Sequence, residues 1–347
     1  MMLNHLEKFY TADTCIVVYH KNCTDGLMAA AVMADALEER FKEVQFFECG
    51  YDAKDYDKLK ELLLNLSNYS IVVVDFSLPK PCLDYIYGDF HFKAGYILDH
   101  HKTAFEMYFP NLPFKSDSAY AETMYDFEVH LDNRKSGAGI AASHFLTDAK
   151  YVRSSLVAYI QDWDLWKFEF GDYTRYFNAY ITAYSDRTVS GFRRLLAAEE
   201  HDPKSVHSFV NTGKTLYEQE QEIVKKIAAG AEDIQLGDLL IPTVFCEKQY
   251  CSKVGNILAS LADNESKIGA CIVAKDGAAE VSLRSIGDVD VSAIAKQYGG
   301  GGHKNAAGFM ITSIEREKVE FYIDAMHFLT IMEDIKKIEE SMETDNG

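Results

Sequence analysis

The sequence has little of what membrane-spanning and secreted proteins carry. None of its apolar runs approaches the roughly 18 consecutive apolar residues that a membrane span requires. Residues 1–9 mix acidic and basic side chains and contain no apolar core of a secretory signal. We therefore expect a cytoplasmic protein that has no membrane partner.

Paired cysteines and basic residues are also scarce. The seven cysteines are an odd number without a Cys-x-x-Cys pair, which indicates reduced thiols and not a disulfide framework. Lysine and arginine number 35 against 54 acidic residues, a formal net charge of −19 at pH 7. Proteins that track long nucleic acids usually carry a basic face that neutralises phosphates. The charge disfavours a long duplex and favours a short or mononucleotide-sized phosphate ester, while local basic residues in a cleft leave nucleic acid as a partner.

The first half of the chain has a regular alternation of strand-like and helix-like segments. Apolar runs predict strands and amphipathic segments predict helices; the strands are 15–20, 44–49, 71–75 and 95–99, and the helices are 26–40 and 53–66. This alternation is typical of a parallel sheet with helices on both faces. Residues 105–135 are irregular and aromatic and are predicted to form a loop.

The second half has fewer and more widely spaced elements. A charged amphipathic stretch at 204–228 predicts a linker helix; after it come predicted strands at 238–246, 268–274 and 279–286, a hairpin turn at 276–277 and a helix at 288–297. With room for two domains, we predict an α/β protein. Its N-terminal parallel-sheet domain spans 1–195, a linker helix spans 196–230, and a smaller α/β domain with a C-terminal helix spans 231–347.

Metal-competent side chains stand at the ends of the apolar runs. Asp99-His100-His101 directly follows one run, and another ends in Asp75. A third leads into His20, and Tyr159-Ile160-Gln161, interpreted in the same way, leads to two further acids. One such acid is commonly a cap or turn residue, but several would meet at the carboxyl edge of one sheet and repel each other. Carboxylate and imidazole ligands suit Mn²⁺, with Mg²⁺ or Fe²⁺ as alternatives, and this is the composition of a two-metal hydrolytic site.

In their order these residues resemble the motifs of the DHH phosphoesterase superfamily, which includes RecJ-type exonucleases, nanoRNA hydrolases and manganese-dependent pyrophosphatases. The motifs are His20 with Asp25-Gly26, then Asp75, then Asp99-His100-His101, then Asp162 or Asp164. In the second half, Val281–Ser285 and Gly299–Phe309 resemble the DHHA1 substrate-binding domain. The resemblance covers about residues 14–312. It implies an active site in the cleft between the two domains.

The resemblance also implies two divalent metal ions, Mn²⁺ first, with Mg²⁺, Zn²⁺, Fe²⁺ or Co²⁺ as alternatives. One ion would be held by His20, residue 23 and Asp75, and the other by Asp25, Asp75, His100 and an acid of the 162–164 segment, so that Asp75 bridges the two. The Asp-x-Trp context of Asp164 fits the fourth motif better, and Asp162 is its rival. Such ions clamp a phosphate oxygen and activate a shared water.

Two catalytic roles follow from the same resemblance. Asp99 would orient an adjacent histidine through a hydrogen bond. His101 would face the scissile phosphate.

Residue 23 departs from the usual family pattern. The family carries Asp-x-Asp-Gly, whereas this sequence reads Cys23-Thr24-Asp25-Gly26. A thiolate ligand would shift the preference towards softer ions such as Zn²⁺. Alternatively, Cys23 only packs and the ion is held by His20, Asp75 and water.

Three glycine-bearing or basic segments are candidates for substrate binding. Gly300, Gly301 and Gly302 expose backbone N–H groups before His303, and such runs form anion-binding concavities. Arg284 offers a bidentate fork for phosphate. Ser136 opens a helical segment whose free N–H groups could meet an anion, although close helix packing explains its glycines equally well.

The predicted function is hydrolysis of a phosphodiester or phosphomonoester bond in a short oligonucleotide or nucleotide by a two-metal site. Alternatives within that class are a 3′-phosphoadenosine phosphate phosphatase and a cyclic or linear dinucleotide phosphodiesterase; a pyrophosphatase is disfavoured by the Gly-rich loop. The alternative of another class is a non-catalytic nucleotide- or RNA-binding protein with a degenerate metal site. A homodimer is one option for its assembly.

Overall fold

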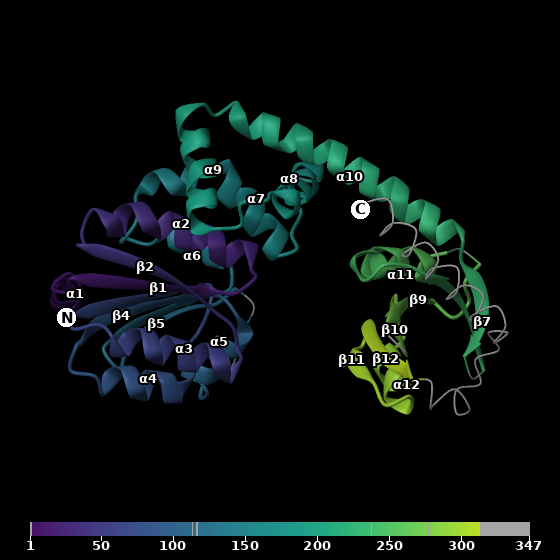
Figure 1. The fold of residues 1–347 in the computed structure, drawn as a ribbon, viewed down its shortest axis with the longest axis horizontal. Helices are drawn as coiled ribbons and strands as arrows, with labels where there is room; N and C mark the ends of the chain where they lie inside the picture. The colour runs from purple at the N-terminus through teal and green to yellow at the C-terminus, as the bar shows by residue number, and fades with distance from the viewer. Residues whose placement is uncertain are drawn as a thin grey trace, which may run out of the picture. The chain divides into compact units, whose positions relative to one another are not determined.

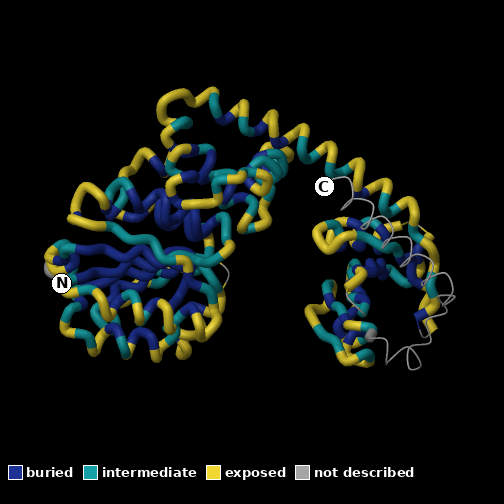
Figure 2. Tube along the Cα trace, in the orientation of Figure 1, coloured by how far each residue is buried: buried dark blue, intermediate teal, exposed yellow. Residues whose placement is uncertain are grey.

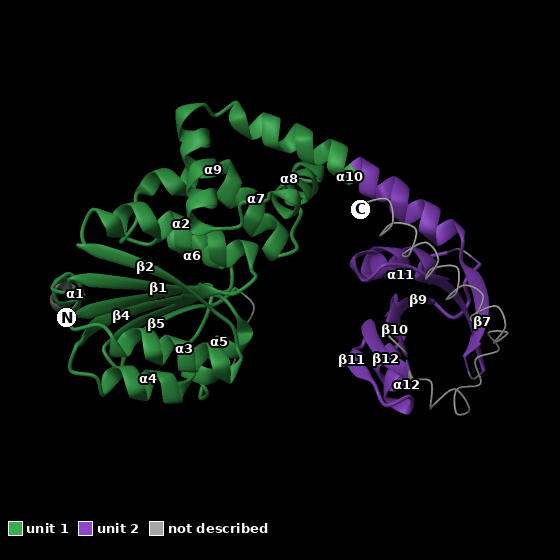
Figure 3. Cartoon of the chain, viewed as in Figure 1, with its two compact units in different colours: residues 1–217 green, residues 218–347 purple. Residues whose placement is uncertain are grey.

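A computed structural model describes residues 2–312, except for 113, 116, 237, 262, 276 and 277. The chain divides into two compact units, residues 1–217 and 218–347, which we call the first and second units (Figure 3). The division falls inside one long helix, α10 (Ser205–Ala229), where the sequence predicts a linker helix. The predicted turn at 276–277 and the predicted C-terminal helix lie outside the described residues. Among the described helices none is long and apolar enough to cross a membrane.

The first unit is built on a six-stranded sheet in the order β2-β1-β3-β4-β6-β5 (Figure 1). Its strands are β1 (Thr14–His20), β2 (Glu43–Cys49), β3 (Tyr69–Val74), β4 (Phe92–Asp99), β5 (Ala119–Met124) and β6 (Phe127–Asp132). The first five in this order are parallel, and only β5 runs antiparallel. The predicted parallel sheet is therefore confirmed, and the carboxyl ends of β1, β3 and β4 lie side by side.

Helices cover both faces of this sheet (Figure 1). They are α1 (Met2–Phe9), α2 (Thr24–Glu38), α3 (Ala53–Leu64), α4 (Lys80–Tyr87), α5 (Lys102–Tyr108), α6 (Gly137–Ser143), α7 (Ser155–Asp164), α8 (Asp172–Ala183) and α9 (Val189–His201), with a 3-10 turn at Ala149–Arg153. Along β1, Cys15 and Val17 pack with α2, whereas Ile16 and Val18 pack with α3. The period of two places alternate side chains in two separate cores, and Figure 2 shows the strands between them as buried.

The second unit has its own six-stranded sheet in the order β11-β12-β10-β9-β8-β7. Its strands are β7 (Glu232–Leu236), β8 (Leu239–Phe245), β9 (Ile268–Lys275), β10 (Ala278–Ser285), β11 (Gly301–His303) and β12 (Ala306–Thr312). Only the β8–β9 pair is parallel. Helices α11 (Cys251–Ala259) and α12 (Val291–Gln297) belong to different cores, so they cover opposite faces; a 3-10 turn, Lys248–Tyr250, precedes α11.

Two predictions about local structure are wrong. Residues 105–135 are not a loop: they hold the end of α5 and the hairpin of β5 and β6. Tyr125 and Asp126 form its two-residue turn with φ of 52° and 57°, a conformation usually signalled by Asn-Gly, which this turn lacks. The segment before Asp162 and Asp164 is helix α7 and not a strand. A short apolar run does not distinguish a strand from a buried helix.

Candidate metal centre

Asp75 lies at the middle of a cluster of imidazole and carboxylate groups in the first unit. It directly follows β3, and its carboxylate is fully buried. His100 Nε2 lies 3.1 Å from Asp75 Oδ1, and His20 Nδ1 lies 3.6 Å from Asp75 Oδ2. The two carboxylate oxygens therefore face different histidines, one from the end of β1 and one following β4. This is the arrangement that a bridging carboxylate requires.

The backbone of Asp75 is held in an uncommon conformation. Its φ of 53° lies in the left-handed region, which costs a non-glycine residue of order 1–3 kcal/mol. Asp75 donates its N–H to Leu98 O at 2.9 Å, which ties the turn to β4. Gly137 packs against it so closely that a Cβ there would stand 2.3 Å from Asp75 Cβ. Glycine at position 137 thus allows α6 to press the carboxylate into the centre.

Asp25 enters the centre from the first turn of α2. Its Oδ1 accepts hydrogen bonds from Ser136 Oγ at 2.6 Å and from the N–H of Ala138 at 3.1 Å. The anion at the N-terminus of α6 is therefore the Asp25 carboxylate itself. Ser136, predicted to bind substrate, is fully buried and caps α6, so it positions Asp25 instead. The residue after Asp25 is Gly26, and a side chain would not fit there because its Cβ would stand 2.8 Å from His20 O.

Asp99 orients His101. Asp99 Oδ1 accepts the backbone N–H groups of His100 and His101 at 2.7 and 3.2 Å, and the Nδ1–H of His101 at 2.7 Å. Asp99 Oδ2 accepts from Ser77 Oγ at 2.5 Å. With Nδ1 committed to Asp99, Nε2 is the nitrogen of His101 that remains for a substrate. Sequence reasoning missed Ser77, whose signal is its position two residues after Asp75.

The structure separates the two acids of α7. Asp164 Oδ2 lies 3.5 Å from His100 Nε2, within the centre. Asp162 accepts the N–H groups of Glu169 and Phe170 and the hydroxyl of Thr174. Both oxygens of Asp162 are thus used to fix the turn before α8 and the first turns of that helix. Asp162 is therefore unsuited to the ligand role that the sequence left open for it.

The charges of the centre shift its pKa values in opposite directions. Burial alone raises the pKa of Asp75, but the imidazoles of His100 and His20 outweigh burial and hold this pKa below its usual range. Burial lowers the pKa of His100, but Asp75 and its acidic neighbours raise it well above the ordinary value. Burial raises the pKa of Asp164 and of Asp25, and the charge of Asp75 adds to both shifts. The cluster thus holds more negative charge than its histidines balance.

The donor atoms fit bound cations. Seven buried side-chain atoms lack a hydrogen-bond partner among the described residues, and three of them belong to the cluster: His20 Nδ1, Asp75 Oδ2 and Asp25 Oδ2. The cluster contains two groups in which all donor atoms lie within 4.8 Å of one another. The first group is His20, Cys23 and Asp75, and the second is Asp25, His100 and Asp164. Buried polar atoms without partners are rare in native proteins and indicate a bound ligand or another compensating group. Bound cations would compensate the three atoms of this cluster.

Cys23 completes the first of these groups. It occupies the N-cap position of α2, where its side chain makes no capping hydrogen bond. Burial raises the pKa of the Cys23 thiol, and the charges of Asp75 and Asp25 raise it further. The thiol is therefore protonated unless a cation compensates these charges. The geometry places the sulfur with the donors that the resemblance implies.

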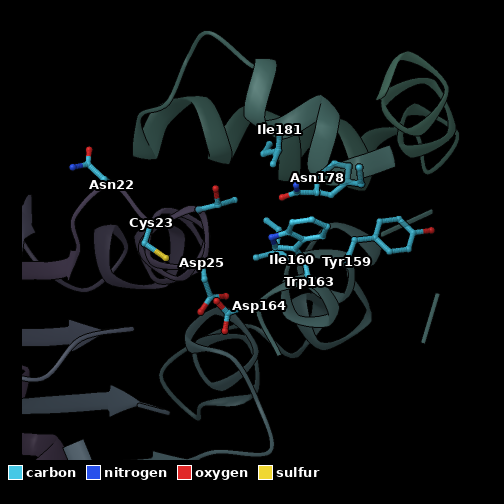
Figure 4. Close-up of a pocket in the computed structure, with 11 residues that line it drawn as sticks. Asn22, Cys23, Asp25, Tyr159, Ile160, Trp163, Asp164, Asn178 and Ile181 are labelled. Atoms are coloured by element: carbon cyan, nitrogen blue, oxygen red, sulfur yellow. The ribbon is translucent and has the colours of Figure 1, made fainter. Parts of the chain in front are cut away.

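A cavity begins at the cluster and continues between α7 and α8 (Figure 4). At one end it is lined by Cys23, Asp25 and Asp164, and beyond them by Tyr159, Ile160, Trp163, Phe177, Asn178 and Ile181. Arg187 reaches its rim, where its guanidinium donates to Thr24 Oγ1 at 3.1 Å and to Ile181 O at 3.2 Å. Sequence reasoning missed this aromatic wall, because the strand predicted for the segment is helix α7.

Two glycines of the run before His303 pack closely against the neighbouring strand β12. A Cβ on Gly300 would stand 2.1 Å from Gly308 O, and one on Gly302, whose φ is 141°, would stand 2.6 Å from Ala306 O. The N–H of Gly300 donates to Ala295 O at 2.9 Å. Close packing of β11 on β12 therefore accounts for these two glycines, whereas a Cβ on Gly301 would meet open space. Of the three glycines predicted to bind an anion, only Gly301 is not explained by packing within the unit.

Arg284 and His303 share one row of the second sheet. Both pair with Ala306 of β12, one from β10 and the other from β11, so their side chains lie on the same face. The guanidinium of Arg284 donates to Ser252 Oγ of α11 at 2.7 Å and to Ser282 Oγ at 3.1 Å. His303 is exposed. Substrate binding by this pair remains a prediction.

Comparisons with known proteins agree with this architecture. Residues 240–328 match the DHHA1 domain. An uncharacterized protein of Acanthamoeba polyphaga mimivirus is 26% identical over 314 residues, which cover 86% of this chain and 68% of that protein. A solved DHH domain, described as a member of the s1p family of ribosomal proteins, is 11% identical with a TM-score of 0.50 and covers 91% of this chain and 88% of its own; this likeness concerns the fold.

A solved exonuclease RecJ bound to manganese is 14% identical to the chain, with a TM-score of 0.47 over 90% of this chain and 89% of its own. The DHHA1 match lies in the second unit, and the ordered His, Asp and Asp-His-His motifs lie in the first. The second unit therefore carries a match to the DHHA1 domain, and the fold of the chain is similar to that of a solved DHH domain.

Proposed function

We propose that this protein is a metal-dependent hydrolase of phosphate esters in nucleotides or short oligonucleotides. The observation that carries the proposal is the carboxylate of Asp75, whose two oxygens lie 3.6 Å from His20 Nδ1 and 3.1 Å from His100 Nε2, in a cluster with three buried atoms that lack partners. His20, Cys23 and Asp75 would hold one divalent cation, and Asp25, Asp75, His100 and Asp164 a second. When bound, such cations polarise a phosphate oxygen and lower the pKa of water.

Asp99 and His101 have roles other than metal binding in this proposal. Asp99 fixes the tautomer of His101 through the hydrogen bond at Nδ1, so that Nε2 is the nitrogen that can contact a phosphate oxygen. Burial lowers the pKa of His101, but the net shift is upward because the hydrogen bond that His101 donates to Asp99 and the charge of Asp99 outweigh burial. His101 therefore tends to carry a positive charge, which suits contact with an anionic phosphoryl group.

The cavity beside the centre supports a nucleotide as the substrate. Tyr159, Trp163 and Phe177 give it aromatic side chains, and Asn178 adds an amide of the kind that pairs with base edges. Arg187 at the rim could meet a further phosphate. The net charge of −19 favours a ligand of few phosphates over a long strand. We infer that the cavity receives the nucleoside next to the scissile phosphate.

A product-resolved assay with Mn²⁺ tests the function. The panel consists of di- to pentaribonucleotides, cyclic dinucleotides, 3′-phosphoadenosine phosphate and pyrophosphate. Turnover that is highest on a mononucleotide or dinucleotide substrate supports the proposal. Tight nucleotide binding without turnover of any panel member would instead identify a binding protein with a degenerate centre.

A tryptophan pair tests the cavity separately. Trp163→Ala should lose about 5- to 100-fold in kcat/KM on a dinucleotide, the scale of one lost base stack, and little on a small chromogenic phosphodiester. Trp166→Ala is the matched control, because Trp166 neighbours Trp163 with ring centroids 5.2 Å apart yet does not line the cavity. Equal losses on both substrates would assign Trp163 to packing alone.

A further inference from the structure

Three cysteines of the second unit meet in space although the sequence separates them. Cys246 directly follows β8, Cys251 is the first residue of α11, and Cys271 lies within β9. The sulfurs of Cys246 and Cys251 are 3.6 Å apart, and all three sulfurs lie within 4.8 Å of one another. We call these residues the thiol cluster. They belong to no motif of the centre described above, and their spacing contains no Cys-x-x-Cys pair that would have signalled them.

The distances fit a metal ion better than a disulfide. Around an ion with metal–sulfur bonds of about 2.3 Å, the sulfurs of a tetrahedral site stand about 3.8 Å apart. A disulfide joins two sulfurs at about 2.05 Å and has no use for a third. Simple apolar packing of thiols is the remaining explanation, since Cys251 and Cys271 are buried beside Val254 and Leu258. Packing, however, does not require three sulfurs from three elements to converge on one point.

The backbone around the thiol cluster is fixed before any ion binds. Cys246 donates its N–H to Ile272 O at 3.1 Å, which holds it beside the strand that carries Cys271. Cys271 Sγ donates to Cys251 O at 3.5 Å, and Cys251 Sγ donates to Glu247 O at 3.6 Å. Because Cys246 is only partly buried, the cluster is accessible from solvent. A preorganised and accessible set of donors costs little rearrangement on binding.

We propose that Cys246, Cys251 and Cys271 bind one thiophilic divalent cation, Zn²⁺ by chemical class, as three thiolates with the fourth position left to a solvent molecule. Three thiols release three protons on binding, so that one divalent cation and three thiolates carry a net charge of −1. No electron is transferred and no co-reactant is needed. Affinity therefore rises with pH until the three thiols are deprotonated.

The consequence of such an ion lies in the position of α11. The ion would join the end of β8, the start of α11 and the middle of β9. Ser252, the residue after Cys251, accepts a hydrogen bond from the guanidinium of Arg284. One turn along, Gly255 lies so close that a Cβ there would stand 2.8 Å from Arg284 Cγ. The ion would thus stabilise the helix against which Arg284 is held. Its role is structural, and it is independent of the hydrolytic proposal.

The experiment uses the full-length chain in a Cys23→Ala background, so that no thiolate remains at the Asp75 centre. Saturating Mn²⁺ occupies the oxygen and nitrogen donors, and Co²⁺ is then added as a spectroscopic probe for Zn²⁺. We expect a thiolate-to-cobalt charge-transfer band that saturates at one ion per chain and disappears when Zn²⁺ is added. Cys246→Ser, at the partly exposed position, should weaken Co²⁺ binding by at least about tenfold. Cys82→Ser, a buried thiol of the first unit, should leave the band unchanged.

A second measurement does not depend on any variant. In the unmodified chain, Zn²⁺ should slow alkylation of Cys246 and raise the melting temperature of the second unit. An unchanged cobalt spectrum in Cys246→Ser would overturn the proposal. So would alkylation of Cys246 at the same rate with and without Zn²⁺, or a Cys246–Cys251 disulfide in the protein purified without reductant. None of these readouts uses phosphoesterase activity.

Discussion

The two donor clusters of this protein differ in chemistry and in the backbone that carries them. The Asp75 centre gathers mainly carboxylates and imidazoles at the carboxyl edge of a parallel sheet. The thiol cluster gathers three sulfurs at the edge of the core between α11 and β9, where Cys251 and Cys271 are buried and Cys246 is partly buried. Hard oxygen and nitrogen donors suit Mn²⁺ or Mg²⁺, whereas thiolates select Zn²⁺. One chain thus offers two environments that suit different ions.

The backbone at the Asp75 centre also differs from the backbone at the thiol cluster. The Asp75 centre includes a residue with φ of 53° and depends on Gly137, where any side chain would collide with Asp75. The cysteines of the thiol cluster have no positive φ: Cys251 is in a helix, Cys271 is in a strand and Cys246 directly follows a strand. Strain is tolerated where reacting groups must be placed and is absent where an ion would only hold elements together. The contrast supports a catalytic role for the first cluster and a structural one for the second.

Replacing Asp75 should produce the largest effect, and it should affect the Asp75 centre but not the thiol cluster. Asp75→Ala removes the carboxylate proposed to bridge the two ions, so both hard ions and nearly all turnover should be lost, by at least about 1,000-fold. Metal analysis should still find one zinc per chain, held by the thiol cluster. If Asp75→Ala retains two manganese ions, the bridging role of Asp75 is wrong.

Asp99→Asn should lower activity by about 10- to 100-fold while the ions remain bound, because it weakens the hydrogen bond that orients His101. The measurement is kcat with manganese content determined on the same sample. Ser77→Ala is the companion variant, since it removes only the hydroxyl that Asp99 Oδ2 accepts, and it should cost less. Loss of manganese in Asp99→Asn would show that Asp99 is itself a ligand.

The two acids of α7 should separate stability from ion binding. Asp162→Ala leaves the N–H of Glu169 and the hydroxyl of Thr174 without an acceptor, which should destabilise the first unit by about 1–3 kcal/mol. Asp164→Ala should lower manganese content but not the stability of the metal-free protein, because it removes one of several mutually repelling carboxylates. Chemical denaturation and metal analysis of both variants decide this; the reverse result would exchange the roles of Asp162 and Asp164.

Cys23→Asp should produce the smallest change and sharpen the contrast between hard and soft donors. A carboxylate in place of the thiol should raise the ratio of activity with Mn²⁺ to activity with Zn²⁺ by a few-fold. Zinc content at the thiol cluster should stay constant, which serves as the internal control. A ratio that does not move would mean that Cys23 packs against the centre without contacting an ion.

Much of the fold could be predicted from the sequence because local signals and tertiary structure agree there. The strand ending at His20 and the strand before Asp75 are apolar runs of strand length, and the structure shows both as buried parallel strands. Parallel strands then bring their carboxyl ends together, so that His20, Asp75 and His100 could be grouped without coordinates. Their proximity depends on topology alone, which alternation of strands and helices predicts well.

The rest depended on contacts that no local pattern carries. Ser136 looked like a free helix N-terminus, and only the fold shows that Asp25 already occupies it. The Gly300 and Gly302 positions looked open, and only strand pairing shows what they pack against. The thiol cluster joins residues 20 positions apart in separate elements, a juxtaposition that spacing rules for adjacent cysteines do not anticipate.

The hydrogen bond from Ala138 to Asp25 has a consequence for how the chain folds. It joins residues 113 positions apart, so the centre exists only after α2 and α6 have both docked on the sheet. Contacts of such long sequence separation form late, because the chain between them must first be ordered. During refolding, helical content should therefore return before catalysis does. A truncated or partly synthesised chain that ends before Ser136 would lack not a peripheral helix but the group that holds Asp25 in place.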